Sequence, residues 1–164
     1  MIQSHPHLTP RQKAREIAFQ FLYRLDQEKI TTEGDEGGAQ AFASRVEKDF
    51  DKHAAHFQVP AESLEFAQRL VRTAATCMLE IDALIGKHAQ NWRIERMGAI
   101  DKAFLRMGVA ELVYFKDVPA SVTMNEVVEL SKLFGEEETP AFLNGILDPI
   151  SREESALKGK VASD

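Results

Sequence analysis

Hydrophobic residues recur at spacings of three and four along most of the chain, which is the period of an amphipathic α-helix. No segment shows the sustained alternation of apolar and polar residues that marks a half-buried β-strand. The pattern therefore predicts an all-α protein with six or seven helices.

The first predicted helix has a complete set of start signals. Thr9 can cap it, Pro10 suits the first helical position, and Gln12 stands where a capping box requires it. The residues of its apolar stripe are Ala14, Ile17, Ala18, Phe21, Leu22 and Leu25. This stripe predicts the face that is buried in the core.

Two helices are predicted in the middle of the chain, after a turn-rich acidic loop at residues 31–38. The first of them ends before Pro60, and the next spans residues 61–87 as one long helix, with Cys77 as a small core residue inside its stripe. The apolar residues of the shorter helix are Phe42, Val46, Phe50 and Phe57.

The last third of the chain predicts a central buried helix at residues 99–115, because this segment is apolar around most of its circumference. After Pro119, Ser121 or Thr123 can cap the next helix, with Thr123 and Glu126 at the spacing of a capping box. Gly135 is a good stop for that helix. Thr139-Pro140 then repeats the start signal of Thr9-Pro10, followed by a stripe of Phe142, Leu143, Ile146, Leu147 and Ile150.

Composition is that of a globular domain, with 164 residues of which 44% are hydrophobic and 28% charged. We expect one domain at residues 9–150, with flexible ends at residues 1–8 and 151–164. The net charge of −6 argues mildly against nucleic acid, although Lys and Arg are dense in the first helix. A single cysteine, no signal segment and no transmembrane run predict a cytoplasmic protein that does not bind membranes.

Catalytic chemistry finds little support in the sequence. Asp49, His53 and His56 lie on one helical face and could hold a metal ion, but no second segment of ligands accompanies them. His53 can equally be a half-buried packing residue. No phosphate-binding glycine loop or nucleophile with its base is visible, so we predict neither an enzyme nor a cofactor.

The polar side of the first helix allows two interpretations. Arg15, Phe19 and Tyr23 follow one another on a face away from the core stripe, with Arg11 at its start and Lys13 on its flank. Exposed rings beside guanidinium groups are typical of surfaces that bind single-stranded RNA. The alternative is a solvated basic first turn whose rings are covered by a neighbouring helix.

Three blocks in order resemble the NusB family of transcription antitermination factors: "RQKAREIAFQFLYRLDQ", "IDKAFLRMGVAELVYFKDVPASVTMNEVVELSKLFG" and "FLNGILD". The resemblance implies two packed helical subdomains, hence about seven helices, and no cofactor or reaction. It implies binding of boxA RNA as a heterodimer with the ribosomal protein NusE. That complex would load onto RNA polymerase and promote antitermination of ribosomal RNA operons.

The resemblance also implies which residues contact RNA. Carried over position by position, these are Arg11, Lys13, Arg15, Tyr23, Asp101, Glu138 and Phe142. Asp101 could instead cap its helix. The family often has a basic residue at the positions of Gln12 and Ala141, so we expect weaker RNA binding by the isolated protein and greater reliance on NusE. The acidic residues 136–138 would lie beside the RNA and weaken non-specific phosphate binding.

Four polar or small residues in the last two helices also call for an explanation. We expect Asn125 and Glu126 to bond to free backbone donors at a helix start. We expect Gly145 to permit close approach of another backbone, with Asn144 bonding across that contact.

Two other functions stay open. A helical module of this kind can bind proteins alone, which the missing basic residues favour. Domains resembling NusB also occur ahead of RNA cytosine methyltransferases, but this chain lacks a glycine-rich Rossmann segment. A homodimer remains an alternative to the monomer, because apolar surface awaiting NusE can pair with itself.

Overall fold

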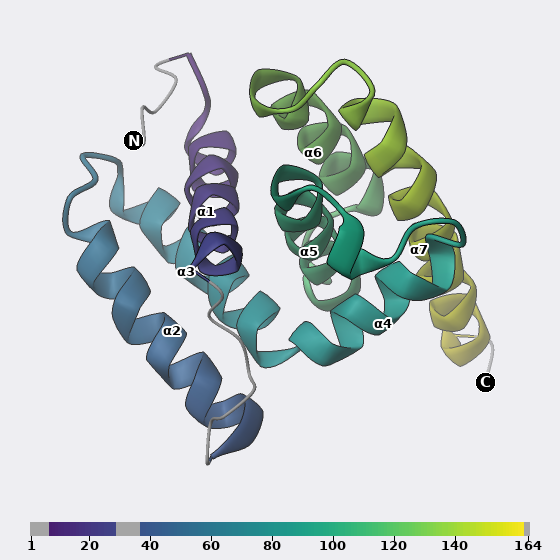
Figure 1. Ribbon diagram of the computed structural model, residues 1–164, viewed down its shortest axis with the longest axis horizontal. Helices are drawn as coiled ribbons and strands as arrows, with labels where there is room; N and C mark the ends of the chain where they lie inside the picture. Colours follow the sequence, from purple (N-terminus) through teal and green to yellow (C-terminus); the bar gives the residue numbers. More distant parts are fainter. Residues whose placement is uncertain (1–6, 29–36, 163–164) are drawn as a thin grey trace. The chain divides into compact units, whose positions relative to one another are not determined.

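The computed structural model describes residues 7–28 and 37–162, and all regular structure in these ranges is helical (Figure 1). The all-α prediction is thereby confirmed, and the expected subdomains correspond to two compact units, Met1–Met78 and Leu79–Asp164. The elements are α1 (Pro10–Gln27), α2 (Gly38–Ala54), α3 (Ala61–Thr76), α4 (Met78–His88), the 3-10 helix η1 (Ile94–Arg96), α5 (Ala99–Tyr114), α6 (Ala120–Phe134) and α7 (Thr139–Ala162). Most of the predicted acidic loop and flexible N-terminal end lies outside the described residues.

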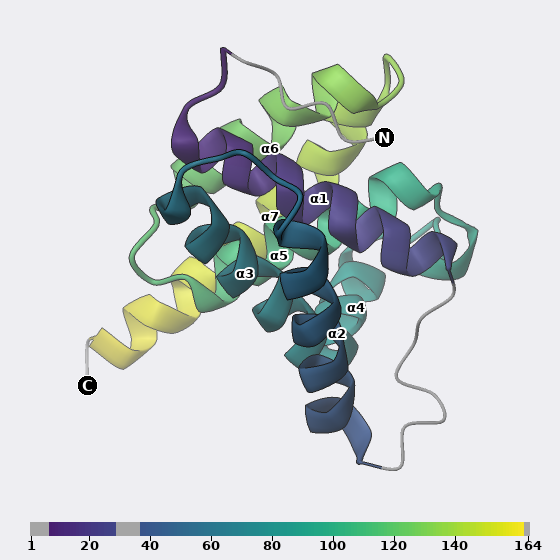
Figure 2. The same cartoon turned by 90° about the vertical axis from the view of Figure 1, so that its left-hand side faces the viewer.

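In the first unit, α3 packs against both α1 and α2 (Figures 1 and 2). The capping box of α1 is formed as predicted: the Gln12 N–H donates to Thr9 Oγ1 over 3.2 Å, and the Thr9 N–H donates to Gln12 Oε1 over 3.0 Å. All six residues of the predicted α1 stripe are buried. The Ser63 hydroxyl donates to the Pro10 carbonyl over 2.9 Å and so joins the first turns of α3 and α1.

The prediction of one long helix at residues 61–87 is wrong. The helix stops at Thr76, and Cys77, with φ −108° and ψ 20°, separates α3 from α4. The stripe before this break belongs to the first unit, and from Leu79 on the chain belongs to the second. Because apolar spacing continues across Cys77, the pattern alone does not reveal the break. Phe57 likewise lies beyond the end of α2.

In the second unit, α5, α6 and α7 all pack against one another (Figure 1). The Leu147 side chain of α7 packs closely against α5 at Gly108, where an added Cβ would lie 3.2 Å from both Leu147 methyl groups. Helix α4 is joined to α5 by Arg106, whose guanidinium donates two hydrogen bonds of 3.0 Å to the Asp82 carboxylate.

Helix α7 is longer than predicted and contains Pro149. It continues through residues 151–162, where the sequence suggests a frayed tail. In this part Glu153 pairs with two residues of α4, with Lys87 Nζ at 2.6 Å and with His88 Nε2 at 2.8 Å.

The predicted caps of α6 are wrong. The helix begins at Ala120 with Pro119 as its N-cap and no side-chain capping bond, so Thr123 lies one turn inside it and is buried. Asn125 and Glu126 therefore lie beyond the first turn of the helix and do not cap it. Gly135 does end α6, as predicted.

The predicted close contact at Gly145 is also wrong. Within the described part of the chain, no neighbouring atom lies within 4 Å of a Cβ added there, and both Asn144 and Gly145 are exposed.

Candidate nucleic-acid interface

The basic residues of α1 are arranged around a ring of α3. The guanidinium carbon of Arg11 lies 4.3 Å from the centroid of the Phe66 ring, and that of Arg15 lies 5.3 Å from it. Arg11 is exposed and Lys13 is half-buried, whereas Arg15 is only 2% exposed. The two arginines are therefore brought together, but only Arg11 offers its charge freely to solvent.

Of the two interpretations of this face, the exposed one is wrong for Arg15 and Phe19, since both side chains are buried, and Phe19 is covered as the alternative expected. The reason is tertiary: Phe66 of α3 provides a ring for the Arg15 guanidinium, an attraction between a cation and the face of an aromatic ring. Tyr23, further along α1, is 36% exposed, and its ring centroid lies 6.4 Å from that of Phe19. Tyr23 is therefore the aromatic residue of this face that a ligand can reach.

Tyr23 opens onto a hollow of about 650 Å³ between α1 and the end of α2, which Arg24, His53, His56 and Phe57 also line. Arg24 donates to His53 Nδ1 over 3.1 Å and to the Asp49 carboxylate. Burial and the Arg24 charge lower the pKa of His53, which keeps its Nδ1 free to accept. Asp49 and His53, considered above as metal ligands, thus serve as acceptors for an arginine.

No group of three or more His, Cys, Asp or Glu side chains among the described residues could hold a metal ion. Nor is any described helix both long and apolar enough to cross a membrane.

The three predicted residues of the second unit, Asp101, Glu138 and Phe142, line one pocket of about 380 Å³. Asp101 comes from the first turn of α5, while the other two come from the start of α7 and the residue before it. The packing of α5 against α7 thus gathers side chains that are far apart in the sequence.

A buried threonine organises this pocket. Thr139 is 5% exposed; its hydroxyl accepts from the Glu136 N–H over 3.0 Å and forms a hydrogen bond with the Asp101 side chain. Thr139 was predicted as a cap of α7, but its hydroxyl instead fixes the turn at residues 136–139. Asp101 makes no capping bond to α5, whose N-cap is Gly98.

The Asp101 carboxylate is partly withdrawn from water. Burial raises its pKa, the hydrogen bond from Thr139 opposes that rise, and the negative charge of Glu138 adds to it. A carboxylate of this kind accepts hydrogen bonds from amino or imino groups, whereas it repels phosphates.

Sequence reasoning missed Trp92, which lines the same pocket. It is 59% exposed, and its ring centroid lies 5.9 Å from that of Phe142 with an interplanar angle of 82°. The sequence does contain a feature that could have pointed to this residue: Trp92 is the only tryptophan of the chain, and it stands in a short polar connection between two helices.

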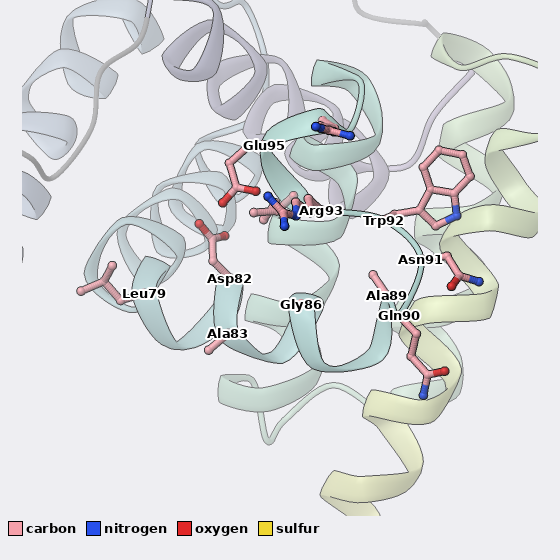
Figure 3. A pocket seen from close by; sticks show the side chains of 12 residues that line it. Leu79, Asp82, Ala83, Gly86, Ala89, Gln90, Asn91, Trp92, Arg93 and Glu95 are labelled. Carbon is pink, nitrogen blue, oxygen red and sulfur yellow. The ribbon is translucent and has the colours of Figure 1, made fainter.

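Trp92 also borders a larger hollow of about 1040 Å³, formed by α4 and the segment that follows it (Figure 3). Figure 3 shows Arg93, Glu95 and Asp82 on one side of that segment and the indole of Trp92 on the other.

The fold and these surfaces define a class of all-helical, two-unit proteins with basic, aromatic and carboxylate side chains on α1, α5 and α7. Residues 12–152 match the model of the NusB family, and the chain belongs to that family. Curated relatives of the family are transcription antitermination proteins, a class of RNA-binding factors without enzymatic activity.

Among the relatives, the transcription antitermination protein NusB of Symbiobacterium thermophilum is 43% identical over 154 residues, which cover 94% of this chain and 95% of that protein. Among solved structures, NusB of T. maritima is 29% identical with a TM-score of 0.70, over 88% of this chain and 92% of the other. A crystal structure of the antitermination factors NusB and NusE in complex with dsRNA is 30% identical with a TM-score of 0.65, over 88% and 97%.

Proposed function

We propose that this protein binds the boxA element of nascent RNA together with NusE and promotes antitermination of ribosomal RNA operons at RNA polymerase, in the cytoplasm. The observation that carries the proposal is the convergence of Asp101, Glu138 and Phe142 on one pocket of the second unit. The solved complex of a similar NusB with NusE and RNA supports both partners.

Each surface contributes a different chemistry in this proposal. Arg11 and Lys13 on α1 neutralise phosphates, and Tyr23 offers a ring to an unstacked base. Asp101 and Glu138 accept hydrogen bonds from base amino groups, and Phe142 provides an apolar wall. Arg15, being buried against Phe66, acts by holding the α1 surface in place rather than by reaching the RNA itself.

The test is fluorescence anisotropy of labelled boxA RNA, titrated with and without NusE and compared with a scrambled RNA. We expect selective binding that strengthens with NusE. Arg11→Gln should weaken it and lower the slope of log affinity against log salt by roughly 0.7, the loss of one phosphate contact on a single strand. Lys132→Gln is the matched control, because Lys132 is an exposed lysine of α6 paired with Glu129 at 2.6 Å.

A second function is favoured by one observation: the pocket of the second unit is lined by three acids, Asp101, Glu136 and Glu138, which oppose phosphate binding. In that case the protein binds NusE or other proteins and does not select RNA. Equal affinity for boxA and scrambled RNA in the presence of NusE would establish this alternative and reject the proposal. Sedimentation of the protein alone would test the homodimer.

A further inference from the structure

Trp92 leaves more of its ring exposed than a structural role requires. The side chain is 59% exposed, although tryptophan is the largest apolar side chain and is highly buried on average. Its edge-to-face contact with Phe142, at 82° and 5.9 Å, holds the indole at one edge of the pocket that contains Asp101 and Glu138. The ring is thus anchored but still accessible to a ligand.

The polar groups around Trp92 are arranged asymmetrically. Arg96, in η1, lines the pocket together with Trp92, Asp101 and Phe142 and also borders the larger hollow, whereas Arg93 lines the larger hollow and not the pocket. Both arginines are exposed, and neither forms an ion pair within the described ranges. Of these two cations, therefore, only Arg96 shares the smaller pocket with the anchored ring.

From this arrangement we infer that Trp92 is a stacking platform for one unpaired base of the RNA, with Arg96 at the phosphate beside that base. An exposed indole with a guanidinium on its flank matches the way proteins hold single-stranded nucleic acid. The pocket, at about 380 Å³, is at the small end of ligand sites, which suits a single nucleotide. This inference rests on the proposed function and adds to it a residue that fixes where one base lies.

The only tryptophan of the chain makes the contact directly measurable, because its emission reports on this one ring. In a titration with boxA RNA and NusE, we expect Trp92 emission to be quenched with the same midpoint as the anisotropy of the labelled RNA. The Trp92→Phe variant gives the background emission of NusE and RNA. Scrambled RNA should leave the emission unchanged at the same concentration.

Variants separate stacking from packing. Trp92→Leu keeps an apolar contact with Phe142 but has no aromatic face, so it should weaken boxA binding by about 5- to 150-fold, the usual range for a lost base–ring stack. Trp92→Phe should keep most of the affinity. Leu79→Ala is the matched control: Leu79 is also an exposed apolar residue, 66% exposed, and lines only the larger hollow, so its removal should not change binding.

A base-deletion series identifies the partner of the ring. An RNA with one abasic position should bind as weakly as the Trp92→Leu variant binds intact RNA, and combining the two changes should cost little more than either alone. Arg96→Gln should lower the salt slope by roughly 0.7, whereas Arg93→Gln should not.

Normal affinity of the Trp92→Leu variant, or unquenched emission at saturating RNA, would overturn the stacking role while leaving the proposed function intact. Absence of selective RNA binding by the unaltered protein with NusE would overturn both.

Discussion

Gly135 offers a direct test of how the turn before α7 is built. A Cβ added there would lie 2.7 Å from the Cβ, Cγ2 and Oγ1 atoms of Thr139. Thr139 cannot swing away, because it is buried and its hydroxyl bonds both the Glu136 N–H and Asp101. The glycine at this position is required for space, since its φ of −95° is open to any residue.

The magnitude of the Gly135→Ala effect follows from these contacts. Overpacking a buried contact costs about 1–3 kcal/mol, and the loss of one of the two Thr139 hydrogen bonds costs about 1 kcal/mol more. We therefore expect a loss of about 2–4 kcal/mol in the free energy of unfolding. With a urea dependence of about 2 kcal/mol per M, the midpoint falls by roughly 1–2 M.

Gly145→Ala is the matched control. It lies in the interior of α7, and no atom of the neighbouring residues that the structure describes lies within 4 Å of the added methyl group. The substitution should therefore stabilise the helix by about 0.5–1 kcal/mol. Both glycines belong to the unit Leu79–Asp164, so urea unfolding followed by circular dichroism reads both on the same part of the chain. A Gly135→Ala variant as stable as the unaltered protein would refute the account of the turn.

Three further predictions concern buried or half-buried polar groups, and each is measured by urea unfolding. Thr123→Val should stabilise the protein by about 1 kcal/mol, because the buried Thr123 hydroxyl has no hydrogen-bond partner among the residues that the structure describes. A clear loss of stability would contradict this. Folding raises the pKa of the Asp101 carboxyl group above its ordinary value. The free energy of unfolding should therefore fall as pH rises through that ordinary value, and Asp101→Asn should abolish this decline. The pKa of His53 is lowered, so the free energy of unfolding should fall as pH drops below 6.5, and His53→Gln should make that fall less steep. If Asp101→Asn or His53→Gln leaves the pH dependence of stability unchanged, the substituted residue is not its source.

Features that depend on a few adjacent residues were predictable from the sequence. The capping box of Thr9 and Gln12 and the stop at Gly135 are local, so residue type and spacing were sufficient. The break at Cys77 was not predictable, because apolar residues continue at helical spacing on both sides of it. The two helices are separate because they contribute to two different compact units, which is a tertiary property.

The candidate site shows the same division between local and tertiary information. The burial of Arg15 depends on Phe66, a residue of another helix, and no property of α1 reveals it. Resemblance named Asp101, Glu138 and Phe142, but their common pocket exists only because α5 packs against α7. Trp92 escaped notice because a tryptophan in a short connection has no periodic pattern around it.

Pro149 divides α7 into two segments that should differ in how readily their backbone hydrogen bonds break. Proline has no backbone N–H, so the Gly145 carbonyl lacks its helical donor and the hydrogen-bond ladder is interrupted there. Before this point Leu143 and Leu147 are fully buried, whereas after it Glu153 makes surface ion pairs with α4. Backbone amides after Glu153 should therefore exchange with solvent deuterium by fraying of the helix end, while those near Leu147 exchange only when the whole unit unfolds. The proline thus sets the limit to which α7 can unwind from its C-terminal end without disturbing the turn that positions Asp101.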